Sequence, residues 1–395
     1  MFLSLLSPLN GANGANGANG ANGANGANGA NGANGANGAN GYAGLSGAIS
    51  NPLLVAGLIQ TTGALASAAP DLFDLKPWVH SETLPAMDNH AAALVQRDPT
   101  TRFHLALVEL LSGLDFDFIT PDTAKIQLRV SGTPNVDLLT LIRPGFAQFK
   151  NQLELVIRRS RLRPERTPEI LTQVTPQYAY WSGICGLHPD VTPRTIEVTY
   201  IALHFVMMVC QRLKHALACP RPHEYSPMVQ PIILTPAYTA WPMGHATEAY
   251  MFTRIICALS PTIETAAKDQ LLKLARRIAD NRVVAGVHFP IDSPAGFVLA
   301  DVMADYFIAK CVAGKVVTPA TLDGRNLLDV VDTDPATIFE PKSEWNKVEY
   351  ERKVPSAWQS TATCSPALSV VMSEMWSRSV SELSANGFEP LPDPA

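Results

Sequence analysis

Apolar residues recur at helical spacing along the chain from about residue 46, and proline-rich breaks divide this pattern into segments. The clearest segment is 192–222, whose apolar face repeats at Ile196, Tyr200, Leu203 and Met207. Thr192 and Pro193 are typical of an N-cap residue and a first helical residue. The pattern therefore predicts a helix that begins at Pro193 and runs toward Pro220.

Three further segments have the same apolar periodicity, namely 244–259, 260–290 and 292–314. We expect Gly244 in the first turn of one helix, Ser260 or Thr262 as the cap of the next, and Ser293 with Pro294 at the start of the last. Strand-like stretches such as AKIQLRVSG (124–132) are too few for a main sheet. The prediction is an all-α protein, built as a packed helical bundle.

Composition divides the chain into four parts. Residues 1–45 contain ten copies of Gly-Ala-Asn, a tract with no large apolar side chain, for which we expect disorder and the role of a tether. We expect an N-terminal helical region over 46–190, the catalytic bundle core over 191–315 and an irregular tail over 316–395.

Charge and cysteine content narrow the classes of function. A formal net charge of −5, without a basic stripe, argues against a nucleic-acid partner. The six cysteines form no Cys-x-x-Cys pair, so we expect reduced and mostly buried thiols. The segment 51–70 ends in an alanine-rich stretch like a cleavage site but lies far inside the chain, and no stretch reaches about eighteen uninterrupted apolar residues. We expect no membrane span and a cytoplasmic location, with secretion left open.

Three fragments hold the residues with candidate chemistry. KHALACPRP, PMGH and RVVAGVHFPID contain Lys214, Arg221, Gly244, His245, Arg282, His288 and Asp292. Taken singly, each has an ordinary interpretation as a solvated charge or a satisfied ring. Together, guanidinium forks, an ammonium and a helix-start N–H suit a tetrahedral or trigonal oxyanion. The two imidazoles add a ligand or nucleophile and a proton-transfer group, and Asp292 is spaced to hold the second nitrogen of His288.

The ordered set Lys-x6-Arg-Pro, Pro-x-Gly-His and Arg-x5-His-x3-Asp resembles the vanadium haloperoxidase and type 2 phosphatidic acid phosphatase superfamily over about residues 190–312. The resemblance implies a helical bundle with the oxyanion at its mouth. It implies that His288 ligates vanadium, or is phosphorylated in a phosphatase, and that His245 is the acid–base residue. It also implies that the anion oxygens are held by Lys214, Arg221, Arg282 and the Gly244 N–H.

Some positions depart from the family motif. Met243 stands where the family has a serine hydroxyl that donates to the anion, and loss of such a bond costs about 1.5 to 3 kcal/mol. Its thioether is either core filling or part of a rim for an apolar substrate. Asn281 replaces the serine before Arg282 and remains polar. By the same resemblance, Tyr238 and Gln211 occupy the halide pocket, and we expect bromide.

The resemblance implies a vanadate-dependent haloperoxidase that oxidises halide with hydrogen peroxide and halogenates a small organic substrate. Vanadate is the expected cofactor. The lack of a predicted span and the extra N-terminal length favour this activity over a soluble acid phosphatase with a phosphohistidine intermediate. A third alternative is an inactive scaffold of the same fold, which Met243 favours. A homodimer is a further expectation.

Overall fold

The computed structural model describes residues 60, 94, 97–132, 134–174, 177–261, 263, 265–329, 358–360 and 364–386. The chain divides into two compact units, Met1–Thr100 and Thr101–Ala395. Only a few positions of the first unit are described, and the Gly-Ala-Asn tract, with its predicted disorder, lies outside the described residues. The fold below is that of the second unit.

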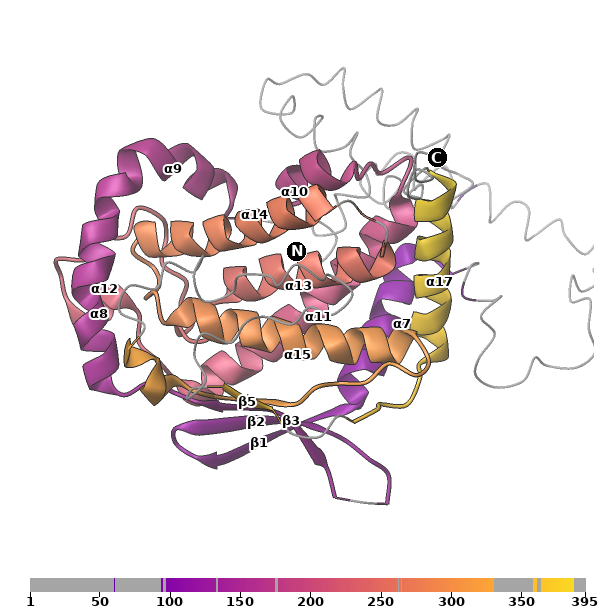
Figure 1. Cartoon of the computed structure of the whole chain (residues 1–395), viewed down its shortest axis with the longest axis horizontal. Helices are drawn as coiled ribbons and strands as arrows, with labels where there is room; N and C mark the ends of the chain where they lie inside the picture. Colours follow the sequence, from indigo (N-terminus) through magenta and orange to yellow (C-terminus); the bar gives the residue numbers. More distant parts are fainter. Residues whose placement is uncertain are drawn as a thin grey trace, which may run out of the picture. The chain divides into compact units, whose positions relative to one another are not determined.

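Four long helices form the centre of this unit: α11 (Pro193–Leu217), α13 (Gly244–Leu259), α14 (Thr265–Val284) and α15 (Asp292–Cys311). Helix α13 packs against the other three (Figure 1). Its Phe252 ring stacks on Trp181 with 4.1 Å between ring centroids, and both side chains are fully buried. Burying such large rings is the main source of stability for a bundle of this kind.

The helices predicted from apolar periodicity are confirmed, although two of their starts are wrong. Helix α11 begins at Pro193 with Thr192 as N-cap, and α13 begins at Gly244, both as predicted. Helix α14 begins at Thr265, and Ser260 is the C-cap of α13, whereas the alternative cap Thr262 lies outside the described residues. Helix α15 begins at Asp292 with Ile291 as N-cap, so Ser293 is not the cap. Backbone bonds in the preceding turn, among them Asp292 N–H to the Phe289 carbonyl at 3.0 Å, extend the helix backward.

Further helices surround this centre. They are α7 (Pro99–Ser112), α8 (Phe146–Arg159), α9 (Arg163–Thr172), α10 (Tyr178–Cys185), the single turn α12 (Pro222–Tyr225) and α17 (Val370–Ala385), with 3₁₀ turns η4 (Ser160–Leu162) and η5 (Gly324–Asp329). Helix α17 crosses one end of the bundle in Figure 1. The Glu382 carboxylate on α17 accepts hydrogen bonds from the Arg194 and Thr195 N–H groups at 2.8 Å each, and so caps α11.

The prediction of an all-α fold is wrong, because the unit also contains a mixed five-stranded sheet with the order β1-β2-β3-β4-β5. The strands are β1 (Leu114–Thr120), β2 (Thr123–Leu128), β3 (Val136–Ile142), β4 (Ala320–Asp323) and β5 (Trp358–Ser360). Only the pairing of β3 with β4 is parallel. Ala124, Ile126 and Leu128 alternate with less buried polar residues along β2, the period of two that a half-buried strand requires.

The sheet and α17 also correct the predicted organisation at both ends. Three strands lie in the region expected to be helical, 46–190, and β4, β5 and α17 lie in the segment expected to be an irregular tail. Strands β3 and β4 contact α15, so the sheet covers one side of the bundle (Figure 1). The described parts of the tail, which contain β4, β5 and α17, therefore belong to the packed unit.

One helical stretch of the described residues, Pro193–Tyr225, is long and apolar enough to cross a membrane by length and composition alone, and 72% of its most apolar window is buried inside the protein. A core helix meets the same criterion. The six cysteines are free, and Cys185, Cys210, Cys219 and Cys311 are buried, which confirms the predicted reduced thiols.

Candidate oxyanion-binding site

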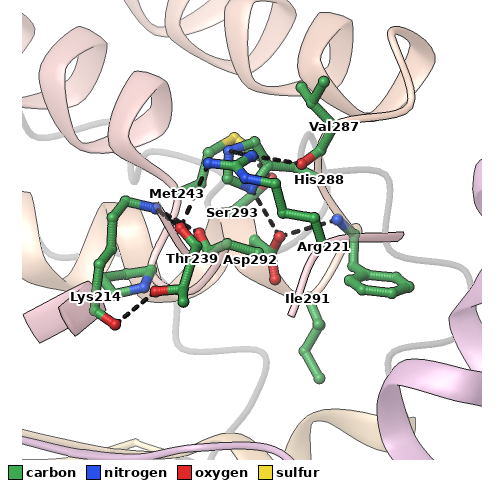
Figure 2. Close-up of polar contacts among 12 residues, drawn as sticks. Lys214, Arg221, Thr239, Met243, Val287, His288, Ile291, Asp292 and Ser293 are labelled. Carbon is green, nitrogen blue, oxygen red and sulfur yellow. Dashed lines mark hydrogen bonds and ion pairs between the residues drawn. The ribbon is translucent and has the colours of Figure 1, made fainter. Parts of the chain in front are cut away.

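Lys214 lies near the C-terminal end of α11 and is fully buried. Its Nζ donates to the backbone carbonyls of Thr239 at 3.0 Å and Ala240 at 2.6 Å, and the Thr239 hydroxyl donates back to the Lys214 carbonyl (Figure 2). Burial lowers the pKa of Lys214 below its ordinary value. These bonds hold the loop that leads into α13 against the end of α11.

Arg221, which follows α11, is also buried and is fixed by backbone carbonyls. Its Nε donates to Tyr238 at 2.8 Å and its Nη1 to Val287 at 2.7 Å. The same Nη1 lies 3.3 Å from Nε2 of His288 (Figure 2). The Tyr238 ring lies 5.2 Å from the guanidinium carbon, within the range of a cation–π contact. Arg221 thus joins the loop before α13 to the turn that contains His288.

The tautomer of His288 follows from its contact with Asp292. Nδ1 lies 2.7 Å from the Asp292 Oδ2, which also accepts the Phe289 N–H at 2.9 Å (Figure 2). A ring nitrogen that donates to a carboxylate leaves the other nitrogen unprotonated, and here Nε2 accepts from Nη1 of Arg221, which can only donate. Burial and the charges of Arg221 and Lys214 hold the pKa of His288 well below its ordinary value. The imidazole is neutral, and its Nε2 can act as a ligand or nucleophile.

In the part of the chain that the structure describes, the burial of Asp292 leaves one of its carboxylate oxygens without a hydrogen bond. Its side chain is fully buried, and its Oδ1 has no hydrogen-bond partner among the described residues. Burial raises the pKa of this carboxyl, whereas the Phe289 N–H and the charges of Lys214 and Arg221 oppose the rise. The predicted role of Asp292 in holding His288 agrees with this geometry.

Arg282, near the C-terminal end of α14, differs from Arg221 in its hydrogen bonding. Its Nη2 donates to the Ile170 carbonyl at 2.9 Å, but Nε and Nη1 are buried with no partner among the described residues. Burial lowers the pKa of Arg282 to about 10, so the guanidinium stays charged at neutral pH. Two buried N–H groups without an acceptor are costly and suit an anion.

A cavity of about 140 Å³ brings most of the predicted residues together. Its polar lining consists of Gln211, Arg221, Tyr238, Gly244, His245, Glu248, Arg282 and His288. Lys214 lies behind this lining, since a Cβ placed on Gly244 would meet its Cε at 3.9 Å. Gly244 is the first residue of α13, and the first N–H groups of a helix have no acceptor within the helix. These groups can jointly bind a small oxyanion such as vanadate.

His245 lines the cavity, and one of its two ring nitrogens is bonded to the backbone. Its Nε2 lies 3.0 Å from the Gln173 carbonyl, so this nitrogen donates a proton to the backbone that follows α9. Burial and the charge of Arg282 lower the pKa of His245 to about 3. The ring is therefore neutral without a bound anion. A bound anion would raise that pKa and restore the acid–base role implied by the resemblance.

Met243, predicted as an anion-binding position, is fully buried and does not line the cavity. Its Sδ lies 3.8 Å from the Ser293 hydroxyl, and its carbonyl lies 2.5 Å from the place where a Cβ on Gly296 would stand. Its thioether fills the contact between α13 and α15, so of the two interpretations core filling agrees with the geometry. Asn281 donates to the Gln173 side chain at 2.9 Å and stays outside the cavity.

Glu248 is the polar residue of the lining that motif analysis missed. It lies one helical turn after Gly244, so its spacing alone placed it on the same face of α13. Because cations usually line an anion site, the motifs gave no reason to expect a carboxylate such as Glu248 there.

Comparison of the chain with protein-family models and with curated protein sequences finds no match. Among the described residues no group of three or more His, Cys, Asp or Glu side chains is arranged to hold a metal ion.

Proposed function

We propose that the protein binds a tetrahedral oxyanion in this cavity and acts as a vanadate-dependent haloperoxidase. The supporting observation is the pair of buried Arg282 N–H groups without an acceptor, beside a second arginine and a neutral imidazole. Each unpaired buried donor costs about 1 to 3 kcal/mol. An anion in the cavity would accept from both and offset that cost.

The residues of the cavity divide the work between binding and proton transfer. Arg282, Arg221 and the Gly244 N–H bind the anion oxygens, and the buried charge of Lys214 raises the local positive potential. His288 offers its Nε2 lone pair, which Asp292 orients through Nδ1. His245 exchanges protons with bound oxygens once an anion raises its pKa. Vanadate, when bound, would supply the activation of hydrogen peroxide for oxygen transfer to halide.

A phosphatase is the second candidate, because the same Nε2 is a competent nucleophile. In that reaction Nε2 forms a bond to phosphorus while the phosphorus–oxygen ester bond breaks, and the leaving oxygen takes a proton from His245. Water then hydrolyses the phosphohistidine. Both candidates use one anion site, so only the reaction separates them.

The test is bromination of a dye by the purified protein with bromide and hydrogen peroxide, with and without orthovanadate. Hydrolysis of a phosphate ester without vanadate is measured in parallel. Bromination that depends on vanadate supports the haloperoxidase. Ester hydrolysis that vanadate inhibits selects the phosphatase, and inactivity in both assays selects the inactive scaffold.

His288→Ala should abolish either activity together with vanadate binding, whereas His245→Ala should remove activity and leave binding. His215→Ala is the matched control, because His215 lies on α11 with an exposed side chain. Equal vanadate binding by the wild type and His288→Ala would contradict the assignment of Nε2.

A further inference from the structure

Glu248 lies inside the cavity that we assign to an anion. Its Oε1 is 3.8 Å from the place where a Cβ on Gly244 would stand, so the carboxyl is close to the start of α13. Among the described residues no hydrogen bond joins Glu248 to a neighbour, although Arg282 beside it has two nitrogens, Nε and Nη1, whose N–H donors have no partner. Both unused groups face one small space, which indicates a ligand that pairs with each of them.

The groups around Glu248 are mostly cationic or neutral. Cys210 and Lys214 face it from α11, Tyr238 from the loop before α13, and Arg282 from α14. On its own helix it shares the cavity with His245, and Arg221 and His288 complete the titratable lining. Both imidazoles are neutral, because burial lowers their pKa values. The charges that act on Glu248 are therefore those of Arg282 and Lys214.

Burial raises the pKa of Glu248 to about 7, although Lys214 and Arg282 lower it. The free cavity therefore holds this carboxyl as a mixture of ionised and protonated forms near neutral pH. An oxyanion that enters brings negative charge within a few ångströms of it. Like charges at that distance disfavour the ionised form, so bound anion and proton stabilise one another.

We propose that Glu248 is part of the oxyanion site and binds the anion as a neutral carboxylic acid, so that a proton enters the site with the anion. A solvent proton bonds to the carboxylate, and the new O–H donates to an anion oxygen; no other bond changes. The inference rests on the proposed function only in requiring that the cavity bind an oxyanion. The proposed site favours anions that, once bound, have an acceptor oxygen facing α13.

Linkage fixes the sign of the pH dependence. Anion binding raises the pKa of Glu248, so affinity is highest below the pKa of the free protein and falls as the pH rises above it. The fall approaches tenfold per pH unit, up to the pKa of the complex. Glutamine at position 248 keeps an N–H donor and removes the titration, which makes Glu248→Gln the informative variant.

Tungstate is the probe, because its charge is constant from about pH 6 to about pH 9, so that protons are taken up only by the protein. Calorimetric titration at about pH 7.5, in two buffers of different ionisation enthalpy, counts the protons bound with each tungstate. We expect the wild type to take up close to half a proton or more beyond Glu248→Gln. Glu154→Gln, at an exposed position on α8, is the matched control and should behave as the wild type.

Equal proton uptake by the wild type and Glu248→Gln would overturn the proposal, and so would a wild type that takes up no proton at all. The second result is measured on the wild type alone, so it does not depend on whether a variant folds. Failure of all three proteins to bind tungstate would overturn the oxyanion site itself, and the proposed function with it.

Discussion

Arg282 provides the sharpest test, because its contributions to folding and to binding should separate. The Arg282→Met substitution removes the hydrogen bond from Nη2 to the Ile170 carbonyl, which is worth about 1.5 to 3 kcal/mol for a charged donor. It also removes two buried unpartnered N–H groups, each of which costs about 1 to 3 kcal/mol. These effects oppose one another, so the free energy of unfolding should change by less than about 2 kcal/mol.

Arg102→Met is the matched control. Arg102 on α7 pairs with Glu197 through Nε at 2.7 Å and Nη2 at 3.1 Å, and both side chains are buried. Breaking a buried pair costs about 3 to 5 kcal/mol when the remaining charge is uncompensated, and Arg194, whose Nη1 lies 3.5 Å from the Glu197 carboxylate, offsets only part of that cost. The control should therefore destabilise the protein more than Arg282→Met, while leaving the cavity intact.

The assay is urea unfolding of the three proteins with and without tungstate. A ligand at about 100 times its Kd stabilises the folded state by about 2.7 kcal/mol. Tungstate should stabilise the wild type and Arg102→Met but not Arg282→Met. The reasoning is refuted if Arg282→Met unfolds as easily as Arg102→Met, or if tungstate stabilises it as much as the wild type.

Three further predictions follow from the packing and charge of the site. Gly296→Ala should lower the free energy of unfolding by about 1 to 3 kcal/mol, since its Cβ would lie 2.5 Å from the Met243 carbonyl. Gly183→Ala in α10, whose Cβ would meet nothing within 4 Å, should raise it by about 0.5 to 1 kcal/mol. Chemical denaturation of both variants measures the difference. Met243→Ser should lower the free energy of unfolding by about 2 to 5 kcal/mol, because it truncates a fully buried side chain, and a thermal melt equal to that of the wild type would contradict this. Burial lowers the pKa of Lys214 to about 8, so the tungstate affinity of Glu248→Gln should fall as the pH rises above that value. The additional Lys214→Met substitution should abolish the fall, and a flat profile before that substitution rejects the assignment.

Local signals in the sequence predicted the helices because their causes lie within a few residues. Pro193 is the first residue of α11, as the local signal predicted, although the Thr192 side chain caps no N–H group of the helix. The sheet depends on residues far apart, since Leu139 of β3 pairs with Ala320 of β4, which has only four residues. Such a short strand has no periodicity of its own, and neither strand indicates its partner. This explains why β4 was missed, but the all-α prediction failed because the strand-like pattern around residues 124–132 was judged too small for a sheet, whereas β1, β2 and β3 form an antiparallel meander within residues 114–142.

The candidate site was predictable where spacing determines geometry. His288 and Asp292 are four residues apart across one turn, and they meet as the spacing suggested. The backbone contact of His245 was not predictable, because Gln173, whose carbonyl accepts from the His245 ring, lies 72 residues away in the sequence. The burial of Met243 depends likewise on Ser293 and Gly296 from a different helix.

The cap that Glu382 provides for α11 has a consequence for the order in which the molecule can form during synthesis. The carboxylate that accepts the Arg194 N–H lies 188 residues later in the chain. At about 5 to 20 residues per second, a ribosome needs roughly 10 to 40 s to cover that distance. For this interval α11, the helix that carries Lys214, has emerged with its first N–H groups still hydrated, and its N-terminal cap forms only once α17 has been synthesised.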